Sequence, residues 1–200
     1  MLKKIAIIGP ESTGKSTLCE QLAQHYNTLW CPEYAREFLM IHGMNYTYDD
    51  LLTIAQGQLE LEEKFIQLAT GNRQLANGPI AHSPLSAGVL SDTTHHSPLF
   101  IDTNMYVMKV WCEFVFGKCH SFILDQIAQR KYDLYFLCGV DLPWTADLLR
   151  ENPDLETRKA LYAIYKSILT NQPVPWVEIS GDSEQRFKKA IGSVDRLLRE

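Results

Sequence analysis

The stretch KIAIIGPESTGKST, residues 4–17, decides the fold. Four apolar residues before Gly9 are typical of a strand buried on both faces, and apolar side chains recur at helical spacing from Lys15 to Tyr26. Between them lies the complete pattern G-x-x-x-x-G-K-[ST], in which a loop wraps around phosphate groups. The strand, loop and helix in this order predict a phosphate-binding loop. The alternative is a chance match in a structural turn.

The chemistry expected of this loop follows from its residue types. Gly9 and Gly14 allow the backbone to curl so that successive N–H groups point inward at phosphate oxygens. The helix that begins near Lys15 adds the positive end of its dipole. The Lys15 ammonium would reach the β- and γ-phosphates of a nucleotide, and the Ser16 hydroxyl would bind Mg²⁺.

The rest of the chain alternates predicted strands and helices. Apolar runs predict strands at residues 29–31, 99–103, 133–139 and 176–180. Helices are predicted at residues 35–41, 47–69, 104–116, 121–129, 152–171 and 182–198, with Thr47 and Asn152 as N-caps and Pro153 at the first position of its helix. This order predicts an α/β fold of three layers with a mostly parallel five-stranded sheet, as in P-loop NTPases.

The composition limits the possible classes of protein. With 200 residues, 46% of them hydrophobic, the chain is expected to form a single domain, residues 1–200, that buries about 70% of its unfolded surface. No apolar run reaches about 18 residues, so no membrane span is expected. The net charge of −5 argues against nucleic-acid binding over a broad surface. Five cysteines without C-x-x-C spacing indicate reduced thiols and a cytoplasmic protein.

Residues 71–98 break the alternation, because Gly, Pro, Ser, Thr and His dominate them without a period. We interpret residues 73–98 as a loop insertion. His95 and His96 could be metal ligands, but they lack acidic or cysteine partners at ligand spacing, which favours solvated loop histidines. The Cys119-His120 pair likewise lacks a second pair of ligands.

A carboxylate stands at the end of the strand predicted at residues 99–103. Open α/β sheets bind ligands at the carboxyl ends of their strands, which is where Asp102 would lie. A P-loop enzyme needs a carboxylate there to hold Mg²⁺ or its water shell. We therefore expect Asp102 to serve the metal. The alternative is that it only caps the following helix.

Two arginines follow the fourth predicted strand. Arg150 and Arg158 flank the Asn152-Pro153 break, which is a possible hinge of a lid over the phosphates. A transferring phosphoryl group needs such cations in addition to lysine and Mg²⁺. The alternative is two solvated arginines. The residues expected to bind the nucleotide are Gly9, Glu11, Ser12, Thr13, Gly14, Lys15, Ser16, Thr17, Arg150 and Arg158.

The segment from Glu33 to Glu37 places two carboxylates, a guanidinium and an aromatic ring just beyond the second predicted strand. A hydroxyl that accepts a phosphoryl group needs a carboxylate to orient it and take its proton, and Glu33 is the candidate. Arg36 could bind either a phosphate or a substrate hydroxyl. The alternative is an ordinary helix N-terminus with Arg36 and Glu37 in water.

Five segments occur in a characteristic order. They are the phosphate-binding loop, Glu-Tyr-x-Arg-Glu-Phe at residues 33–38, Ile-Ala-x-Gly-Gln at 54–58, Phe-Ile-Asp-Thr at 100–103, and Trp-x-x-Asp-x-x-Arg at 144–150, with Arg158 eight residues on. Together they resemble the ribosylnicotinamide kinase domain of the bacterial NadR family. The resemblance runs from about residue 5 to residue 180.

The resemblance implies a nucleoside-kinase-like fold and a kinase that uses ATP and Mg²⁺. Its substrate would be the ribose 5′-hydroxyl of nicotinamide riboside, and its product nicotinamide mononucleotide. The adenylyltransferase and DNA-binding activities of the larger proteins are not expected here. The resemblance implies catalytic roles for Lys15, Glu33, Asp102 and Arg150, substrate binding by Glu33, Tyr34, Arg36, Gln58 and Asp102, and metal binding by Ser16 and Asp102.

One position departs from the family, since Pro32 stands where the family has a tryptophan that stacks on the pyridine ring. Trp30 or Tyr34 could replace that contact, so the preferred nucleoside stays open, as does the choice between ATP and GTP. The alternative functions are a P-loop ATPase or GTPase that acts as a switch, and a nucleotide-binding module without catalysis.

Overall fold

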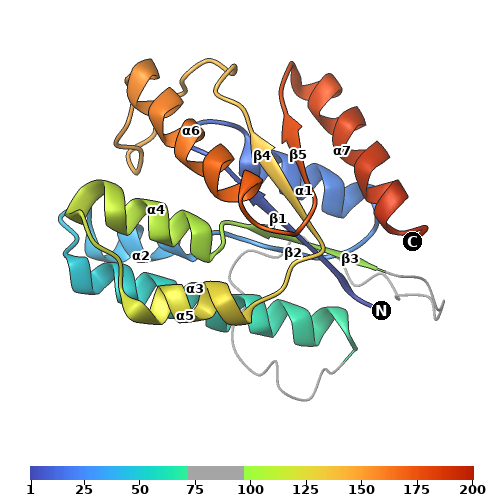
Figure 1. Cartoon of the computed structure of the whole chain (residues 1–200), viewed down its shortest axis with the longest axis horizontal. Coiled ribbons are helices and arrows are strands. Elements are labelled where there is room, and N and C mark those ends of the chain that lie inside the picture. Colours follow the sequence, from blue (N-terminus) through green and yellow to red (C-terminus); the bar gives the residue numbers. More distant parts are fainter. Residues whose placement is uncertain (72–96) are drawn as a thin grey trace.

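The computed structural model of the protein describes residues 1–71 and 97–200. In these ranges, five strands form one sheet in the order β2-β3-β1-β4-β5, and all its hydrogen-bonded pairs are parallel (Figure 1). The sequence prediction of a mostly parallel five-stranded sheet is confirmed. The strands are β1 (Lys3–Ile8), β2 (Trp30–Cys31), β3 (Pro98–Asp102), β4 (Leu134–Cys138) and β5 (Trp176–Ile179).

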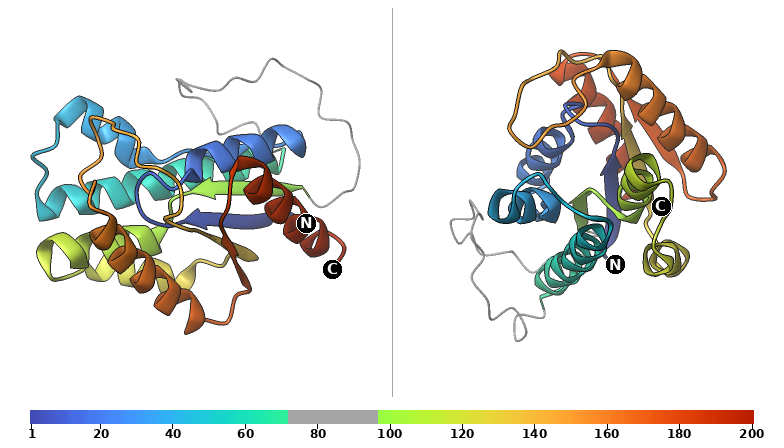
Figure 2. Two further views of the ribbon diagram at one scale, coloured as in Figure 1. Left: turned by 90° about the horizontal axis from the view of Figure 1, so that it is seen from above. Right: turned by 90° about the vertical axis from the view of Figure 1, so that its left-hand side faces the viewer.

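Helices cover both faces of the sheet, which gives the three predicted layers. Helices α1 and α7 pack on one face, and α4 and α6 pack on the other. The right-hand view of Figure 2 shows α1 and α4 on opposite sides of the sheet. The helices are α1 (Lys15–His25), α2 (Tyr34–His42), α3 (Tyr48–Ala69), α4 (Met105–Phe116), α5 (Ser121–Gln129), α6 (Leu155–Thr170) and α7 (Ser183–Leu197).

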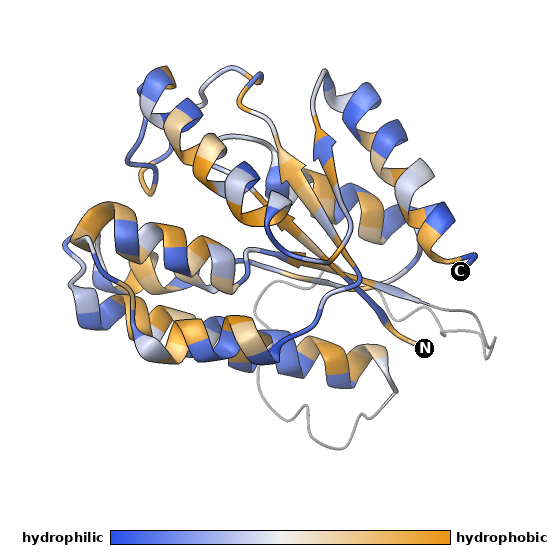
Figure 3. Ribbon diagram, in the orientation of Figure 1, coloured by the Kyte–Doolittle hydropathy of each residue, from blue (hydrophilic) through white to orange (hydrophobic). Residues whose placement is uncertain are grey.

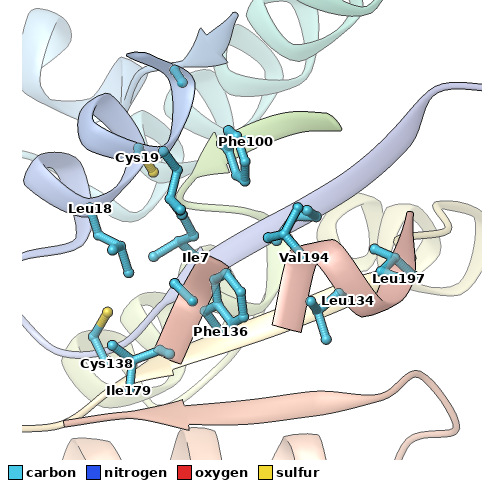
Figure 4. Close-up of a cluster of buried hydrophobic side chains, with 14 residues drawn as sticks. Ile7, Leu18, Cys19, Phe100, Leu134, Phe136, Cys138, Ile179, Val194 and Leu197 are labelled. Carbon is cyan, nitrogen blue, oxygen red and sulfur yellow. The ribbon is translucent and has the colours of Figure 1, made fainter. Parts of the chain in front are cut away.

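Strand β1 lies at the centre of the core. Ile5 and Ile7 pack toward α1 and α7, whereas Ala6 and Ile8 pack toward α4 and α6, because successive side chains of a strand point to opposite faces. All four residues are fully buried. Figure 3 shows that the central strands are mostly hydrophobic, and Figure 4 shows Ile7 among the side chains of the α1 and α7 face. A strand buried on both faces is what residues 4–8 predicted.

The start of α6 differs from the prediction. Asn152 and Pro153 do not open this helix, which begins at Leu155 with Asp154 as its N-cap. The Asp154 carboxylate accepts a hydrogen bond of 2.7 Å from the Thr157 N–H. The Asn152 side-chain amide and backbone N–H both donate to Glu11 instead, and Asn152 lies in the loop before the helix.

Some of the other sequence expectations concern residues that the structure describes, and some do not. Most of the predicted loop insertion, including His95 and His96, lies outside them. Pro98 is the first residue of β3, a position that proline tolerates in a strand, so the loop prediction is wrong at its last residue. All five cysteines are free thiols, as predicted. In the described ranges, no helix has the length and apolar character needed to cross a membrane, and no cluster of His, Cys, Asp or Glu is arranged to hold a metal ion.

Candidate active site

The loop between β1 and α1 has the backbone of a phosphate-binding loop. Gly9, Ser12 and Gly14 all have positive φ angles, of 143°, 54° and 76°. A Cβ atom on Gly9 would come within 2.8 Å of the Cys138 carbonyl oxygen, so a larger residue cannot fit there. Gly14 is the N-cap of α1 and has no side chain to cap the helix. The first N–H groups of α1 are thus available to an anion.

A cavity of about 370 Å³ lies against this loop. The Lys15 ammonium folds back on the loop and donates to the Pro10 carbonyl oxygen over 3.0 Å. Nine of the ten residues predicted to bind the nucleotide line the cavity, the exception being Arg158. The lining also includes Glu33 and Arg36, so the loop and the predicted acceptor segment share one space. The nine are Gly9, Glu11, Ser12, Thr13, Gly14, Lys15, Ser16, Thr17 and Arg150.

Asp102 lies where the sequence predicted it. Its Oδ2 accepts a hydrogen bond of 2.5 Å from the Ser16 hydroxyl, and among the described residues its buried Oδ1 has no partner. Asn104, not Asp102, caps α4, so the capping alternative is wrong. Burial raises the pKa of the Asp102 carboxyl to about 6, the Glu33 carboxylate adds to this increase, and Lys15 opposes it.

The donor set beside the loop fits a magnesium ion. Mg²⁺ prefers carboxylate and hydroxyl oxygens, and it usually takes one or two carboxylates together with substrate phosphates. Ser16 lines the cavity, and Asp102, which is buried and is not among the lining residues, accepts the Ser16 hydroxyl and keeps an unpartnered Oδ1.

Glu33 turns away from its own helix. It is the N-cap residue of α2, but its carboxylate makes no cap hydrogen bond to the described residues of that helix. Glu33 lines the cavity instead and accepts a hydrogen bond of 3.3 Å from the Thr103 hydroxyl. The alternative, in which Arg36 and Glu37 lie in water, holds for the exposed Glu37 and only in part for Arg36, whose side chain is half exposed. The Glu33 carboxylate is in position to serve an acceptor hydroxyl.

Arg36, on α2 near Glu33, connects this helix to the segment between β4 and α6. We call that segment, residues 139–154, the lid segment. The Arg36 Nη2 donates a hydrogen bond of 2.5 Å to the Asp147 carboxylate. This bond holds the pKa of the Asp147 carboxyl below its usual value. The Arg36 guanidinium lines the cavity while half of its side chain remains exposed.

Tyr34 and Gln58 do not have the predicted contact with the cavity, since neither is among the described residues that line it. Gln58 is buried, and its amide accepts from the Tyr34 N–H and donates to the Pro32 carbonyl oxygen, over 2.8 and 3.2 Å. The Tyr34 ring lies over Gly57, where an added Cβ would come within 2.2 Å of it. These residues fix the backbone that leads into Glu33, and their role as substrate ligands stays a prediction.

The two predicted lid arginines both reach the phosphate-binding loop. Arg150 donates to the Ser12 hydroxyl over 3.4 Å, and Arg158 donates to the Ser12 carbonyl oxygen over 3.2 Å. The Trp144 ring lies close to both guanidinium groups, at 5.9 and 5.3 Å. Arg158 is only 2% exposed, so it is not a solvated arginine, but it supports the loop from outside the cavity.

Glu11 holds the lid segment to the loop. Its carboxylate accepts hydrogen bonds from the backbone N–H groups of Glu151 and Asn152, over 3.0 and 2.9 Å. Glu11 lines the cavity, as expected of a nucleotide-binding residue, but in this structure its oxygens serve the lid segment.

Sequence reasoning missed an aromatic wall of the cavity, which we define as Tyr46, Trp111 and Phe114, with Val115 beside it. The Trp111 N–H donates to the Tyr46 hydroxyl over 2.9 Å, and that hydroxyl donates to Glu151 over 2.6 Å. Phe114 and Val115 are each 46% exposed, although both belong to the apolar side of α4. The apolar side of α4 is wider than packing against the core requires. This excess of apolar residues is the signal that could have indicated a binding surface.

A second missed residue is Arg186 on α7, which is only 5% exposed. It donates to the carbonyl oxygens of Thr13, Gly139 and Gly181, over 2.9, 3.2 and 2.7 Å, and forms an ion pair with Asp141. One side chain thereby joins the phosphate-binding loop to the loops that follow β4 and β5.

Comparison with known proteins agrees with this geometry. The chain is 25% identical over 201 aligned residues to the trifunctional NAD biosynthesis/regulator protein NadR of Salmonella typhimurium, and equally to that of Escherichia coli. All of this chain and 43% of each relative are aligned, so the chain spans less than half the length of these relatives.

Solved structures show the same fold. A NadR protein in complex with NR superposes with a TM-score of 0.73 at 20% identity, over all of this chain and 50% of that one. A NadR protein in complex with NAD and AMP-PNP gives 0.66 at 19% identity, with the same coverage. Thymidylate kinase from Ehrlichia chaffeensis gives 0.62 at 13% identity, over 96% of this chain and 98% of that one.

A family model described as AAA domain matches residues 4–77 and 85–186. These ranges hold the phosphate-binding loop, Glu33, Asp102, the lid segment and Arg186, and they make up most of the chain. The protein therefore belongs to this AAA domain family.

Proposed function

We propose that this protein is an ATP-dependent kinase that phosphorylates the 5′-hydroxyl of nicotinamide riboside to give nicotinamide mononucleotide. The observation that carries the proposal is that Glu33 and the phosphate-binding loop share one cavity. Phosphoryl transfer to an alcohol needs this pairing, because a carboxylate near the phosphates can orient the hydroxyl and accept its proton. The similarity to NadR proteins supports nicotinamide riboside as the acceptor.

On the phosphate side, the backbone N–H groups of the loop and the Lys15 ammonium would bind the β- and γ-phosphates. Ser16 and Asp102 would hold Mg²⁺, which when bound neutralises negative charge on those phosphates. Arg150 would move its guanidinium from the Ser12 hydroxyl to the transferring group.

On the acceptor side, the cavity suits a positively charged ring. The pyridinium of nicotinamide riboside carries a positive charge, and the lining includes the carboxylates of Glu33 and Glu151 together with the rings of Tyr46 and Trp111. Aromatic faces and carboxylates both attract such a cation. The aromatic wall could thus supply the contact that Pro32 cannot make.

The test is ADP release from ATP in the presence and absence of nicotinamide riboside, with the product identified by mass. We expect ADP to form only with the acceptor, and nicotinamide mononucleotide to accumulate in equal amount. A panel of other nucleosides, and GTP in place of ATP, would define both specificities. Equal ADP release with and without every nucleoside would contradict a kinase and support a switch NTPase.

Two variants test the assigned roles. Lys15→Ala should abolish turnover, because the charge that meets the phosphates is lost. Glu33→Gln should lower kcat by about 100-fold or more and leave ATP binding unchanged, since general-base removal typically costs that much. Glu37→Gln is the matched control, because Glu37 is an exposed carboxylate on the same helix. A Glu33→Gln variant as active as Glu37→Gln would refute the base assignment.

A further inference from the structure

Thr103 has an unusual backbone conformation beside the cavity. Its φ angle is 73°, in the left-handed region, and it is a β-branched residue, for which that region is a genuine outlier. Thr103 is 1% exposed, and its N–H donates to the Ile7 carbonyl oxygen of β1 over 3.3 Å. Packing therefore holds a conformation that the residue itself disfavours. Such strain is concentrated at functional sites.

The Thr103 hydroxyl donates to Glu33, the candidate base. Among the described residues, this hydroxyl is the one hydrogen-bond partner of the Glu33 carboxylate. Glu33 stands at the N-cap position of α2 but makes no cap hydrogen bond, so its carboxylate is free to face the cavity. The strained Thr103 and this carboxylate thus meet in a single 3.3 Å contact.

The neighbouring residue ties this contact to the phosphate site. Asp102 and Thr103 are consecutive, and while the Asp102 carboxylate accepts from Ser16 on α1, the Thr103 hydroxyl donates to Glu33 before α2. The end of β3 therefore fixes a group on the nucleotide side and a group on the acceptor side at once.

We propose that Thr103 is a positioning residue that orients the Glu33 carboxylate toward the acceptor hydroxyl. The proposal rests on the proposed kinase function. A base that loses its orienting partner spends less time in a productive geometry, and a misplacement of about 1 Å costs up to about 100-fold in rate. Removal of the hydroxyl should therefore lower kcat by about 10- to 100-fold and leave the KM for ATP unchanged.

The experiment compares three substitutions at this position. Thr103→Val has nearly the same shape without the hydroxyl, and should show the full loss in kcat. Thr103→Ser keeps the hydroxyl and should stay within about threefold of the wild type. Thr103→Gly lacks the hydroxyl but accepts the positive φ angle without strain, so it replaces the valine variant if that protein fails to fold. It should show the same loss in kcat.

A double-mutant cycle separates positioning from a purely structural role. In the Glu33→Gln background there is no base to orient, so Thr103→Val should cause little further loss in kcat. An equal loss in both backgrounds, or a hydroxyl-free variant with wild-type kcat, would overturn the role of Thr103. A wild-type protein that transfers no phosphate to any nucleoside would overturn the proposed function as well, so the two failures are distinguishable.

Discussion

Replacement of Arg186 by methionine should destabilise the protein and weaken its phosphate site together. The arginine is 5% exposed and donates to carbonyl oxygens of three separate loops, while its ion-pair partner Asp141 is 40% exposed. Methionine fills a similar volume but leaves those hydrogen bonds unmade. Breaking a buried ion pair from one side typically costs about 3–5 kcal/mol.

The expected loss lies at the lower end of that range. Asp141 can regain water when its partner is removed, which lessens the penalty of an unpaired charge. We therefore expect a loss of about 3 kcal/mol in the free energy of unfolding, which for a chain of this size corresponds to a fall in Tm of roughly 6–12 °C. The Thr13 carbonyl would lose its donor, so the loop should be less well ordered for ATP. We expect the Kd for ATP to rise about tenfold.

Thermal unfolding followed by circular dichroism and ATP titration by calorimetry measure the two effects. Arg196→Met is the matched control, because Arg196 is an exposed arginine on the same helix and should contribute less than about 1 kcal/mol. If Arg186→Met unfolded at the temperature of Arg196→Met, the stability argument would fail. If it unfolded early but bound ATP like the wild type, support of the loop by Arg186 would be refuted.

Three further predictions concern other charged groups. In chelator, the contribution of Asp102 to the stability of the nucleotide-free protein should fall by roughly 3 kcal/mol as pH rises from 4 through about 6, because burial raises the Asp102 pKa and the folded state then binds the proton more tightly than the unfolded state. The urea-stability profiles of wild type and Asp102→Asn should differ by this amount across that pH range, and parallel profiles would contradict the cause. Glu62→Ala should lower the free energy of unfolding in urea by about 3 kcal/mol with kcat unchanged, since the buried carboxylate pairs with Lys4 and Arg130 far from the cavity. A loss of kcat without a loss of stability would refute this structural role of Glu62. Glu11→Ala should speed tryptic cleavage after Arg150 several-fold relative to Glu156→Ala, because Glu11 accepts hydrogen bonds from the adjoining lid backbone. Equal cleavage rates in the two variants would show that Glu11 does not hold the lid segment in place.

The features that sequence predicted are those encoded locally. Residues 4–17 carry their strand, turn and helix signals within fourteen positions, so the phosphate-binding loop followed directly. Asp102 could be placed because a polar residue after an apolar strand lies at the carboxyl edge of a parallel sheet. Glu33 could be singled out because it follows the second strand at that edge, where an acceptor hydroxyl needs a carboxylate to take its proton.

The features that sequence did not reveal depend on contacts between distant segments. Arg186 and Thr13 are 173 positions apart, and nothing local distinguishes Arg186 from the exposed basic residues of its helix. The hydrogen bonds of the buried Gln58 amide to Tyr34 and Pro32 could not be predicted, because a motif gives residue types but not the direction of an amide. The start of α6 was misplaced because Asn152 and Asp154 are both residue types that cap helices, and the structure uses Asp154. The hydrogen bonds that Asn152 donates to Glu11, 141 positions away, leave no local signal in the sequence.

The lid segment is anchored at both ends of the cavity, to Glu11 on the nucleotide side and to Arg36 and Tyr46 on the acceptor side. A ligand that displaces either set of contacts changes the free energy of the same segment. The affinities for nucleotide and acceptor are then thermodynamically linked, and the factor by which one ligand alters the binding of the other must be equal in both directions. In such an arrangement, the coupling between the two ligands passes through a single stretch of backbone that belongs to neither site alone.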